Sequence, residues 1–368
     1  MKGYILRKLF SLLIISLFML VGCLPDHTSS QSGNIRTFPV GNFPIKIVAD
    51  ASNNVWVLNF KSNTITKLNH SQGVVGTYSV DPSASNIAVD AQGNVWVTSV
   101  QNSTIVELNS SGQKIGDFSA GFDPIGIAID VTGNIWVVNG TDSVTELSSN
   151  GSLIGTYYVG VNPVDIVIDA KGNIWVSNMS DNTVSELSST GTLLGTYSVG
   201  ITPTAIAVDQ KGNVWVANYG DNTVTEINSN GITGGTYNVT TGPDHISVDP
   251  LGNIWVEGDS ITKISSGGTA KPSTFAIGTC PCDMAVDSSG NIWVIDSTNG
   301  KVNTLNTNGG IIGSYNVGLA PIGITIDQKG NVWVINAGSN NATELVDAAQ
   351  GPQYVPYKGP QFIGGGNW

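Results

Sequence analysis

Charged residues are scarce in this chain, and basic residues are the scarcest of them. Only 11% of the 368 residues are charged, with 15 Lys and Arg against 27 Asp and Glu, so the net charge is −12. Affinity for duplex nucleic acid comes mainly from Lys and Arg side chains that neutralise phosphates. We therefore expect no nucleic-acid partner. Ser, Thr, Asn and Gly fill the chain instead, as many tight turns between neutral strands require.

A long hydrophobic run is found at the N-terminus. Lys2, Arg7 and Lys8 precede an apolar stretch over 9–22. The stretch is too short and wrongly flanked for a spanning helix, so it predicts a secretion signal over 1–22. Removing this signal takes away three positive charges and no negative ones, which changes the net charge to −15.

Cys23 is the candidate lipidation site. The segment Leu20-Val21-Gly22-Cys23 resembles the bacterial lipobox, in which the cysteine becomes the lipidated N-terminus. The alternative is a plain signal peptide, with Cys23 incidental. More than one acyl chain gives lasting attachment to a bilayer. We therefore expect an exported lipoprotein of the bacterial cell envelope, held on a membrane through a flexible tether over 23–33.

An aspartate stands six residues before a tryptophan in eight repeats, and successive tryptophans lie 38 to 40 residues apart. Such a period, built from short strands, is typical of a β-propeller with one blade per repeat. We expect the aspartates to form turns and the tryptophans to pack between blades rather than to form a ligand cage. The aspartates are Asp50, Asp90, Asp130, Asp169, Asp209, Asp249, Asp287 and Asp327. The tryptophans, in the same order, are Trp56, Trp96, Trp136, Trp175, Trp215, Trp255, Trp293 and Trp333.

The repeats continue without a linker over 34–347, which predicts one all-β domain, an eight-bladed β-propeller of four-stranded antiparallel blades. The last repeat lacks a fourth strand, whereas Thr37-Phe38-Pro39-Val40-Gly41 matches the fourth-strand pattern. The N-terminal segment should therefore supply the outer strand of the last blade and close the ring. A Pro/Gly-rich tail with four aromatic residues follows over 348–368. It is expected to be either a disordered end or a segment that docks on the propeller or on a partner.

The repeat pattern Pro-x-x-Ile-Ala-Val-Asp-x-x-Gly-Asn-Val-Trp-Val resembles NHL-repeat propellers, and in particular the streptogramin B (virginiamycin B) lyase-like group. The resemblance covers about 310 residues and implies the propeller fold. The lyase opens a cyclic depsipeptide by elimination, using a metal, histidine and carboxylates. In its repeats a His follows Pro, and a Glu stands three residues after Trp.

This chain departs from the lyase pattern at both positions. No residue that follows a repeat proline is histidine. Three residues after the tryptophans stand Asn59, Ser99, Asn139, Asn178, Asn218, Gly258, Asp296 and Asn336, of which Asp296 is a carboxylate. The general base and the metal ligands are largely missing, which counts against an enzyme.

A second resemblance is looser. The segment Ala88-x-Asp90-x-x-Gly93-x-x-Trp96 is similar to the tryptophan-docking motif of eight-bladed quinoprotein propellers, but its spacing is one residue shorter on each side of the glycine. A quinone cofactor is therefore not supported. The same architecture serves membrane-anchored lipoproteins that act as assembly scaffolds, which implies a non-catalytic scaffold.

Candidate binding residues are found where the repeats differ from one another. Two residues after the proline, or after Ala84 in the second repeat, the side chains are mostly polar and mutually unlike. They should lie around the central channel, either as ligand contacts or as solvated residues at its mouth. The ligand-binding candidates are Lys46, Asn86, Asp165, Asp244, His245 and Asp283, and the catalytic candidates are His245, Glu257 and Asp296.

The sixth and seventh repeats hold most of the irregular residues, because Asp244-His245 is followed by Cys280-Pro281-Cys282-Asp283. Adjacent blades should bring His245 near Cys282 and Asp283. An imidazole and two thiolates suit zinc or copper, so His245, Cys280 and Cys282 are candidate metal ligands. A Cys280–Cys282 disulfide and two free thiols are the alternatives.

The sequence thus favours a monomeric, lipid-anchored propeller that binds or scaffolds a protein, peptide or glycan at the cell envelope. No cofactor is expected, apart from the possible divalent metal. The alternative function is a lyase-like enzyme that opens a cyclic peptide or lactone.

Overall fold

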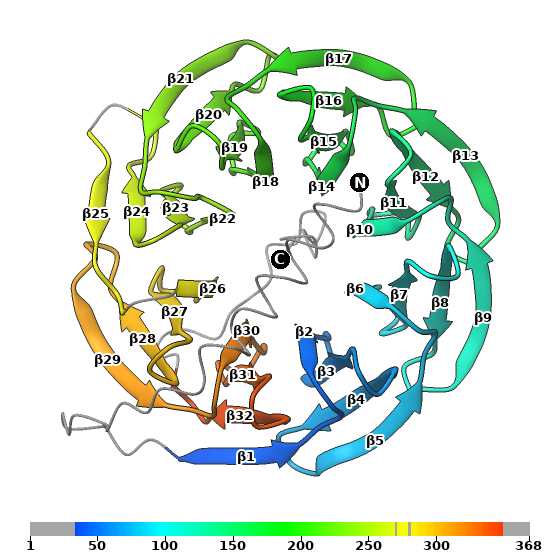
Figure 1. Ribbon diagram of the computed structural model, residues 1–368, viewed down its shortest axis with the longest axis vertical. Helices are drawn as coiled ribbons and strands as arrows, with labels where there is room; N and C mark the ends of the chain where they lie inside the picture. Colours follow the sequence, from blue (N-terminus) through cyan, green and yellow to red (C-terminus); the bar gives the residue numbers. More distant parts are fainter. Residues whose placement is uncertain (1–33, 269–270, 279–280, 349–368) are drawn as a thin grey trace.

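The computed structural model describes residues 34–268, 271–278 and 281–348. Within these residues every regular element is a β-strand, and no helix there is long and apolar enough to cross a membrane. The strands form eight four-stranded antiparallel sheets, arranged as blades around a central axis (Figure 1). The prediction of an eight-bladed β-propeller is confirmed.

Blades 1 to 4 each contain four consecutive strands, and the first strand lies at the centre of the ring and the fourth at its rim. Blade 1 is β2 (Pro44–Ala49), β3 (Asn54–Asn59), β4 (Thr64–Asn69) and β5 (Gly73–Ser79). Blade 2 is β6 (Ala84–Val89), β7 (Val95–Ser99), β8 (Thr104–Leu108) and β9 (Lys114–Ser119). Blade 3 is β10 (Pro124–Ile129), β11 (Ile135–Asn139), β12 (Ser143–Leu147) and β13 (Leu153–Tyr158). Blade 4 is β14 (Pro163–Ile168), β15 (Ile174–Asn178), β16 (Thr183–Leu187) and β17 (Leu193–Ser198).

Blades 5 to 7 repeat this order, and blade 8 takes its outer strand from the N-terminus. Blade 5 is β18 (Pro203–Val208), β19 (Val214–Asn218), β20 (Thr223–Ile227) and β21 (Thr233–Asn238). Blade 6 is β22 (His245–Val248), β23 (Ile254–Glu257), β24 (Ile261–Ile264) and β25 (Ser273–Phe275). Blade 7 is β26 (Pro281–Val286), β27 (Ile292–Asp296), β28 (Lys301–Leu305) and β29 (Ile311–Asn316). Blade 8 is β30 (Pro321–Ile326), β31 (Val332–Asn336), β32 (Asn341–Leu345) and β1 (Ile35–Pro39).

The ring closes where β1 pairs with β32, so that the first and last strands lie side by side at the rim (Figure 1). The Phe38 ring stacks on Trp333 with 5.6 Å between centroids. Arg36 Nη1 lies 3.2 Å from Glu344 Oε2, and this carboxylate also contacts His70 Nδ1 at 2.6 Å. Closure of the last blade by the N-terminal strand is confirmed, and the outer edge of β32 is paired with β1.

The repeated aspartate shapes a turn and also orients the tryptophan of its own blade. In blade 5, Asp209 Oδ1 accepts from the backbone N–H groups of Lys211 and Asn213, each at 2.9 Å. Its Oδ2 accepts from Trp215 Nε1 at 3.2 Å. All eight blades have this carboxylate–indole bond, at 3.0 to 3.2 Å. A glycine with positive φ, such as Gly212 at 81°, completes the turn.

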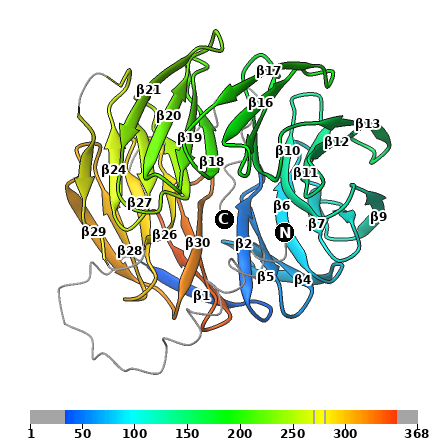
Figure 2. The same cartoon turned by 45° about the horizontal axis from the view of Figure 1, so that its top comes forward.

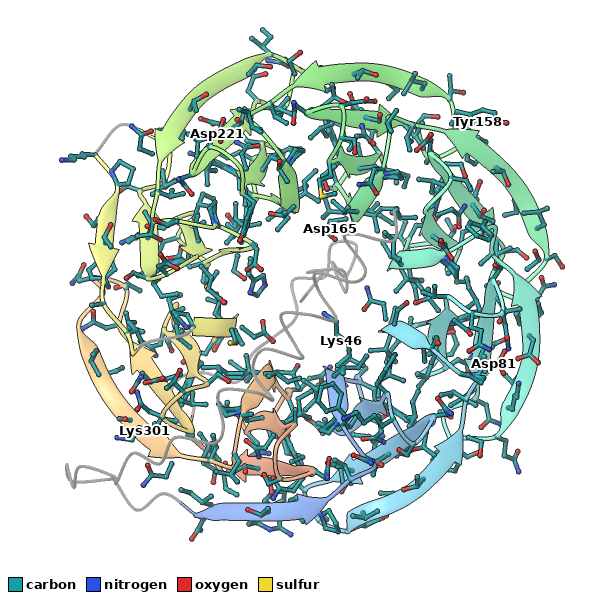
Figure 3. All side chains as sticks on the ribbon, viewed as in Figure 1. Lys46, Asp81, Tyr158, Asp165, Asp221 and Lys301 are labelled. Carbon is teal, nitrogen blue, oxygen red and sulfur yellow. The ribbon has the colours of Figure 1, made fainter. Side chains whose placement is uncertain are left out.

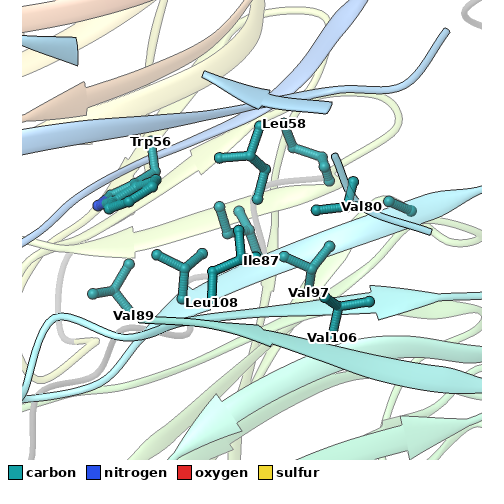
Figure 4. Close-up of a cluster of buried hydrophobic side chains, with 11 residues drawn as sticks. Trp56, Leu58, Val80, Ile87, Val89, Val97, Val106 and Leu108 are labelled. Carbon is teal, nitrogen blue, oxygen red and sulfur yellow. The ribbon is translucent and has the colours of Figure 1, made fainter. Parts of the chain in front are cut away.

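The hydrophobic core lies between neighbouring blades rather than within any one of them. Figure 4 shows the cluster in which Trp56 and Leu58 of blade 1 pack on Ile87 and Val97 of blade 2. The inner strands, among them β2, β18 and β30, face the centre of the ring (Figure 2). The contacts that hold the ring together are therefore the contacts between successive blades.

The repeat tryptophans are structural residues of this core, as predicted. Each belongs to a cluster of buried side chains drawn from two adjacent blades. Burying about 150–250 Å² of each, at about 25 cal/mol per Å², contributes roughly 4–6 kcal/mol gross. None is exposed by more than 2%, so the indole rings are not available as a ligand cage: Trp56, Trp96, Trp136, Trp175, Trp215, Trp255, Trp293 and Trp333.

Candidate functional site

Each blade has one position of the ring near the start of its inner strand, two residues after the proline or Ala84. In seven blades the pairing between the inner and second strands shifts there, which is typical of a β-bulge. Lys46 and Asp165 mark this ring near the central opening (Figure 3). The full set is Lys46, Asn86, Gly126, Asp165, Ala205, His245, Asp283 and Gly323.

Two aspartates of this ring hold neighbouring blades together. Asp165 Oδ1 accepts from the next backbone N–H of its own strand at 2.9 Å, and Oδ2 accepts from Ile206 N of blade 5 at 3.1 Å. Asp283 repeats the arrangement with its own strand at 2.9 Å and with Ile324 N of blade 8 at 2.9 Å. Both carboxylates therefore clasp adjacent inner strands.

Asn86 also joins two neighbouring inner strands, through an uncharged amide. Its Oδ1 accepts from Ile87 N at 2.9 Å, and its Nδ2 donates to the carbonyl of Ile125 in blade 3 at 3.3 Å. Asn86, Asp165 and Asp283 are buried, so the expectation of solvated residues at a channel mouth does not hold for these three. Ligand binding by the ring stays a prediction.

His245, Glu257 and Asp283 form a buried group between blades 6 and 7. His245 lies opposite Glu257 in the β22–β23 pair. Its Nδ1 is 3.2 Å from Asp283 Oδ1 and 3.6 Å from Glu257 Oε2. The three residues are each at most 3% exposed. The structure thus brings together two catalytic candidates, His245 and Glu257, with the binding candidate Asp283, and His245 is itself also a binding candidate.

Burial disfavours the charged form of the Asp283 carboxyl and raises its pKa to about 6. Repulsion from the Glu257 carboxylate acts in the same direction. His245, the Ile324 backbone amide and Lys46 lower the pKa and partly oppose the increase.

The other two acidic candidates lie at strand ends. Asp244 is half-buried, and its backbone N–H donates to the Glu257 carbonyl at 3.1 Å. Asp296 ends β27 and accepts from the backbone N–H of Asn299 at 3.3 Å and from Asn299 Nδ2 at 2.7 Å. Asp296 therefore shapes the loop that leads to β28.

Five asparagines occupy the position where the lyase-like repeats carry glutamate, and each is 0% exposed. Asn218 Nδ2 donates to Thr223 Oγ1 at 3.0 Å and to Thr225 Oγ1 at 2.9 Å, which joins the second and third strands. A Cβ added to Gly200 would lie 2.6 Å from Asn218 Nδ2, so the neighbouring chain needs a glycine. The other four make equivalent bonds to side chains of the third strand: Asn59, Asn139, Asn178 and Asn336.

Cys282 packs against the cluster of Ile295 and Ile324 between blades 7 and 8. Cys280 lies outside the described residues. Among the residues that the structure does describe, no group of three or more His, Cys, Asp or Glu could hold a metal ion. A metal, a disulfide or free thiols at this place stay predictions, as does lipidation of Cys23. The signal over 1–22, the tether over 23–33 and the tail from residue 349 onward also lie outside the described chain.

The sequence analysis did not predict a set of hydrogen bonds between tyrosine hydroxyls and glutamates that lie opposite the tryptophans. In blades 3 to 5 a tyrosine hydroxyl of the outer strand donates to a glutamate opposite the tryptophan, at 2.8, 2.7 and 3.0 Å. Burial raises the pKa of each tyrosine to about 12, and the hydrogen bond to the glutamate and the charge of that glutamate add to the increase. The signal was a constant spacing of eleven residues in the pairs Glu146/Tyr157, Glu186/Tyr197 and Glu226/Tyr237.

No protein-family model and no curated protein matches this sequence. Among solved structures, one described as a streptogramin B lyase is 18% identical, with a TM-score of 0.60 over 86% of this chain and 100% of that one. This chain folds like the streptogramin B lyases. A catalytically inactive histidine-to-alanine variant of virginiamycin B lyase from Staphylococcus aureus, solved with quinupristin, is 16% identical with a TM-score of 0.59, over 85% and 99% of the two chains. BamB from Moraxella catarrhalis is 13% identical, with a TM-score of 0.66 over 84% and 98%. At these identities the similarity shows the fold alone.

Proposed function

We propose that this protein is an exported, lipid-anchored propeller that binds or scaffolds another molecule at the cell envelope and catalyses no reaction. The observation that carries the proposal is the set of buried asparagines typified by Asn218. These side chains stand where lyase-like repeats carry glutamate, and their amide N–H groups donate to side chains inside the blades. A residue committed to joining two strands is not available as a general base.

The hydrogen bonds by which the central ring joins adjacent inner strands support the same conclusion. Asp165 and Asp283 join adjacent blades because their carboxyl oxygens accept from backbone N–H groups of the next blade, so these oxygens are used in closing the ring. The fold similarity to BamB agrees with the scaffold role implied by the resemblance to membrane-anchored propellers. The predicted lipobox at Cys23 supports the envelope location, which labelling with a radioactive fatty acid and a Cys23→Ser variant would test.

A ring-opening assay tests the absence of catalysis. Purified protein is incubated with quinupristin and Mg²⁺, and the linear product is sought by mass spectrometry. We expect no product above the protein-free control. Turnover that grows with protein concentration would contradict the proposal.

A lyase-like activity is the second candidate, favoured by His245 Nδ1 lying 3.2 Å from Asp283 and 3.6 Å from Glu257. His70 offers a matched control, because its Nδ1 also contacts a buried glutamate, Glu344, at 2.6 Å. Turnover that is lost in His245→Ala and kept in His70→Ala would establish the lyase-like alternative.

A further inference from the structure

One face of the ring carries two kinds of loop that are joined into a continuous surface. The loops between second and third strands meet the loops that lead from an outer strand to the next blade. In blade 5, Ile201 N donates to Asp221 Oδ2 at 3.0 Å and Tyr219 N donates to the Thr202 carbonyl at 2.9 Å. In blade 4, the backbone N–H of residue 161 donates to Asp181 Oδ2 at 2.6 Å. These hydrogen bonds join the loops of neighbouring blades into one surface.

Large apolar side chains are exposed on this face over blades 3 to 5, and Tyr158 at the rim is 81% exposed (Figure 3). At the position of Tyr158 the outer strands of five other blades end in serine or asparagine: Ser79, Ser119, Ser198, Asn238 and Asn316. Folding therefore does not require an aromatic residue there. The exposed set, between 45% and 81%, is Phe122, Tyr158, Val161, Ile201 and Tyr219.

Uncompensated carboxylates lie among these apolar residues. No Lys or Arg occurs in 115–170, 172–210 or 212–262. Lys171 and Lys211 sit in the Asp–Gly turns, at the opposite ends of the strands. Within the described residues no ion pair joins a cation to the four carboxylates, whereas Asp81 of the preceding loop pairs with Lys114 at 3.2 Å. The four are Asp123, Asp142, Asp181 and Asp221, and we call them, with the five apolar residues, the acidic–apolar crescent.

The negative charge of the crescent is not needed to build the loops. Asp142 Oδ1 accepts from a backbone N–H at 2.9 Å, and Asn182 does the same at the equivalent place in the next blade, also at 2.9 Å. Asp181 and Asp221 likewise accept from a backbone N–H where blade 1 uses the Ser62 hydroxyl, at 3.0 Å. Uncharged side chains thus do this structural work in other blades. Lys301, by contrast, lies across the ring from Tyr158 (Figure 3).

We propose that the acidic–apolar crescent docks a segment of another protein in which basic side chains alternate with apolar ones. The apolar residues supply buried contact area, with Tyr158 and Tyr219 as anchors, and the carboxylates select a basic partner and repel an acidic one. Exposed apolar patches rimmed by polar groups mark such interaction sites. This inference rests on the proposed binding function and gives that function a surface and a partner chemistry.

Binding of a defined peptide tests the proposal. The probe is a fluorescein-labelled peptide of alternating Lys and Leu, followed by fluorescence anisotropy, with Lys/Ser and Glu/Leu peptides for comparison. We expect the mature protein to prefer the Lys/Leu peptide. Replacing Tyr158 and Ile201 together by serine should weaken binding about tenfold or more. Replacing Asp181 and Asp221 by asparagine, which keeps an acceptor for the loops, should weaken binding and reduce its dependence on salt.

Val131→Ser with Leu251→Ser is the matched control, because these side chains are 67% and 65% exposed in the Asp–Gly turns of the opposite face. Binding unchanged by this pair supports the crescent. Equal weakening by the control pair, equal affinity for the Lys/Ser peptide, or binding that survives all crescent substitutions would overturn it. These outcomes would not contradict the proposed function. That proposal is contradicted by turnover of quinupristin, which is measured in a separate assay on the unsubstituted protein.

Discussion

Adding one hydroxyl group to blade 2 should stabilise the propeller, and more so at high pH than at low pH. Blade 2 has Phe118 where blades 3 to 5 have tyrosine, so its outer strand offers Glu107 no hydroxyl at this position. Burial raises the pKa of Glu107 to about 7, and the Asp90 carboxylate adds to the increase. A raised pKa means that Glu107 contributes stability at acidic pH that is lost as the pH rises through about 7.

The Phe118→Tyr variant should have room for the new hydroxyl. Phe118 packs at a tilt on Trp96 with 5.8 Å between centroids, and Tyr157 stacks on Trp136 at 5.7 Å in blade 3. The outer strand has a glycine beside the ring tip in both blades, Gly116 in blade 2, so the hydroxyl meets no Cβ. A hydrogen bond to a charged group contributes about 1.5–3 kcal/mol, and one between neutral groups about 0.5–1.5 kcal/mol.

We therefore expect Phe118→Tyr to raise the free energy of unfolding by about 1.5–3 kcal/mol near pH 8 and by less than about half of that near pH 5. Urea or thermal unfolding of both proteins at the two pH values is the measurement. Tyr157→Phe is the reciprocal control and should destabilise, again more at the higher pH, because it removes the donor to Glu146. A Phe118→Tyr effect that is destabilising, or equal at both pH values, would refute this reasoning.

Three further outcomes follow from the contacts. Asp209→Ala removes two backbone bonds and the bond to Trp215 Nε1, so unfolding measurements should show a loss of about 2–4 kcal/mol, whereas Asp209→Asn should lose less. Removing residues 34–41 takes away β1, the outer partner of β32, and leaves Glu344 without Arg36, so calorimetry should show a clearly lower unfolding temperature than removal of 1–33. Wild-type protein should lose up to about 3 kcal/mol from Asp283 as the pH rises from about 4 to 6, and an equally steep pH profile in Asp283→Asn would contradict this.

The fold was predictable because the same turn residues and strand patterns recur once in every blade. The Asp–Trp spacing fixes a turn and an indole in each blade, and the unpaired fourth-strand pattern around Phe38 locates the closure. The bond between the Asp carboxylate and Trp Nε1 was not predicted, although both residues recur at a constant distance. Spacing shows that two residues belong together, but not which atoms meet.

The candidate site was predictable only in part. Adjacency of blades 6 and 7 correctly placed His245 beside Asp283, because the position in the repeat fixes the height of a side chain along the axis. The clasping role of Asp165 was not foreseen, since it depends on the bulge that turns its carboxylate toward the next blade. The crescent was also missed, because the exposure of Tyr158 and Phe122 depends on the loops around them rather than on the strand pattern.

Asparagines such as Asn218 join the second and third strands of their blades. The most direct test is the free energy of unfolding of Asn218→Ala, compared with wild type. We predict a loss of about 1–3 kcal/mol, because two buried hydroxyl partners lose their donor. Unchanged stability in Asn218→Ala would contradict the account.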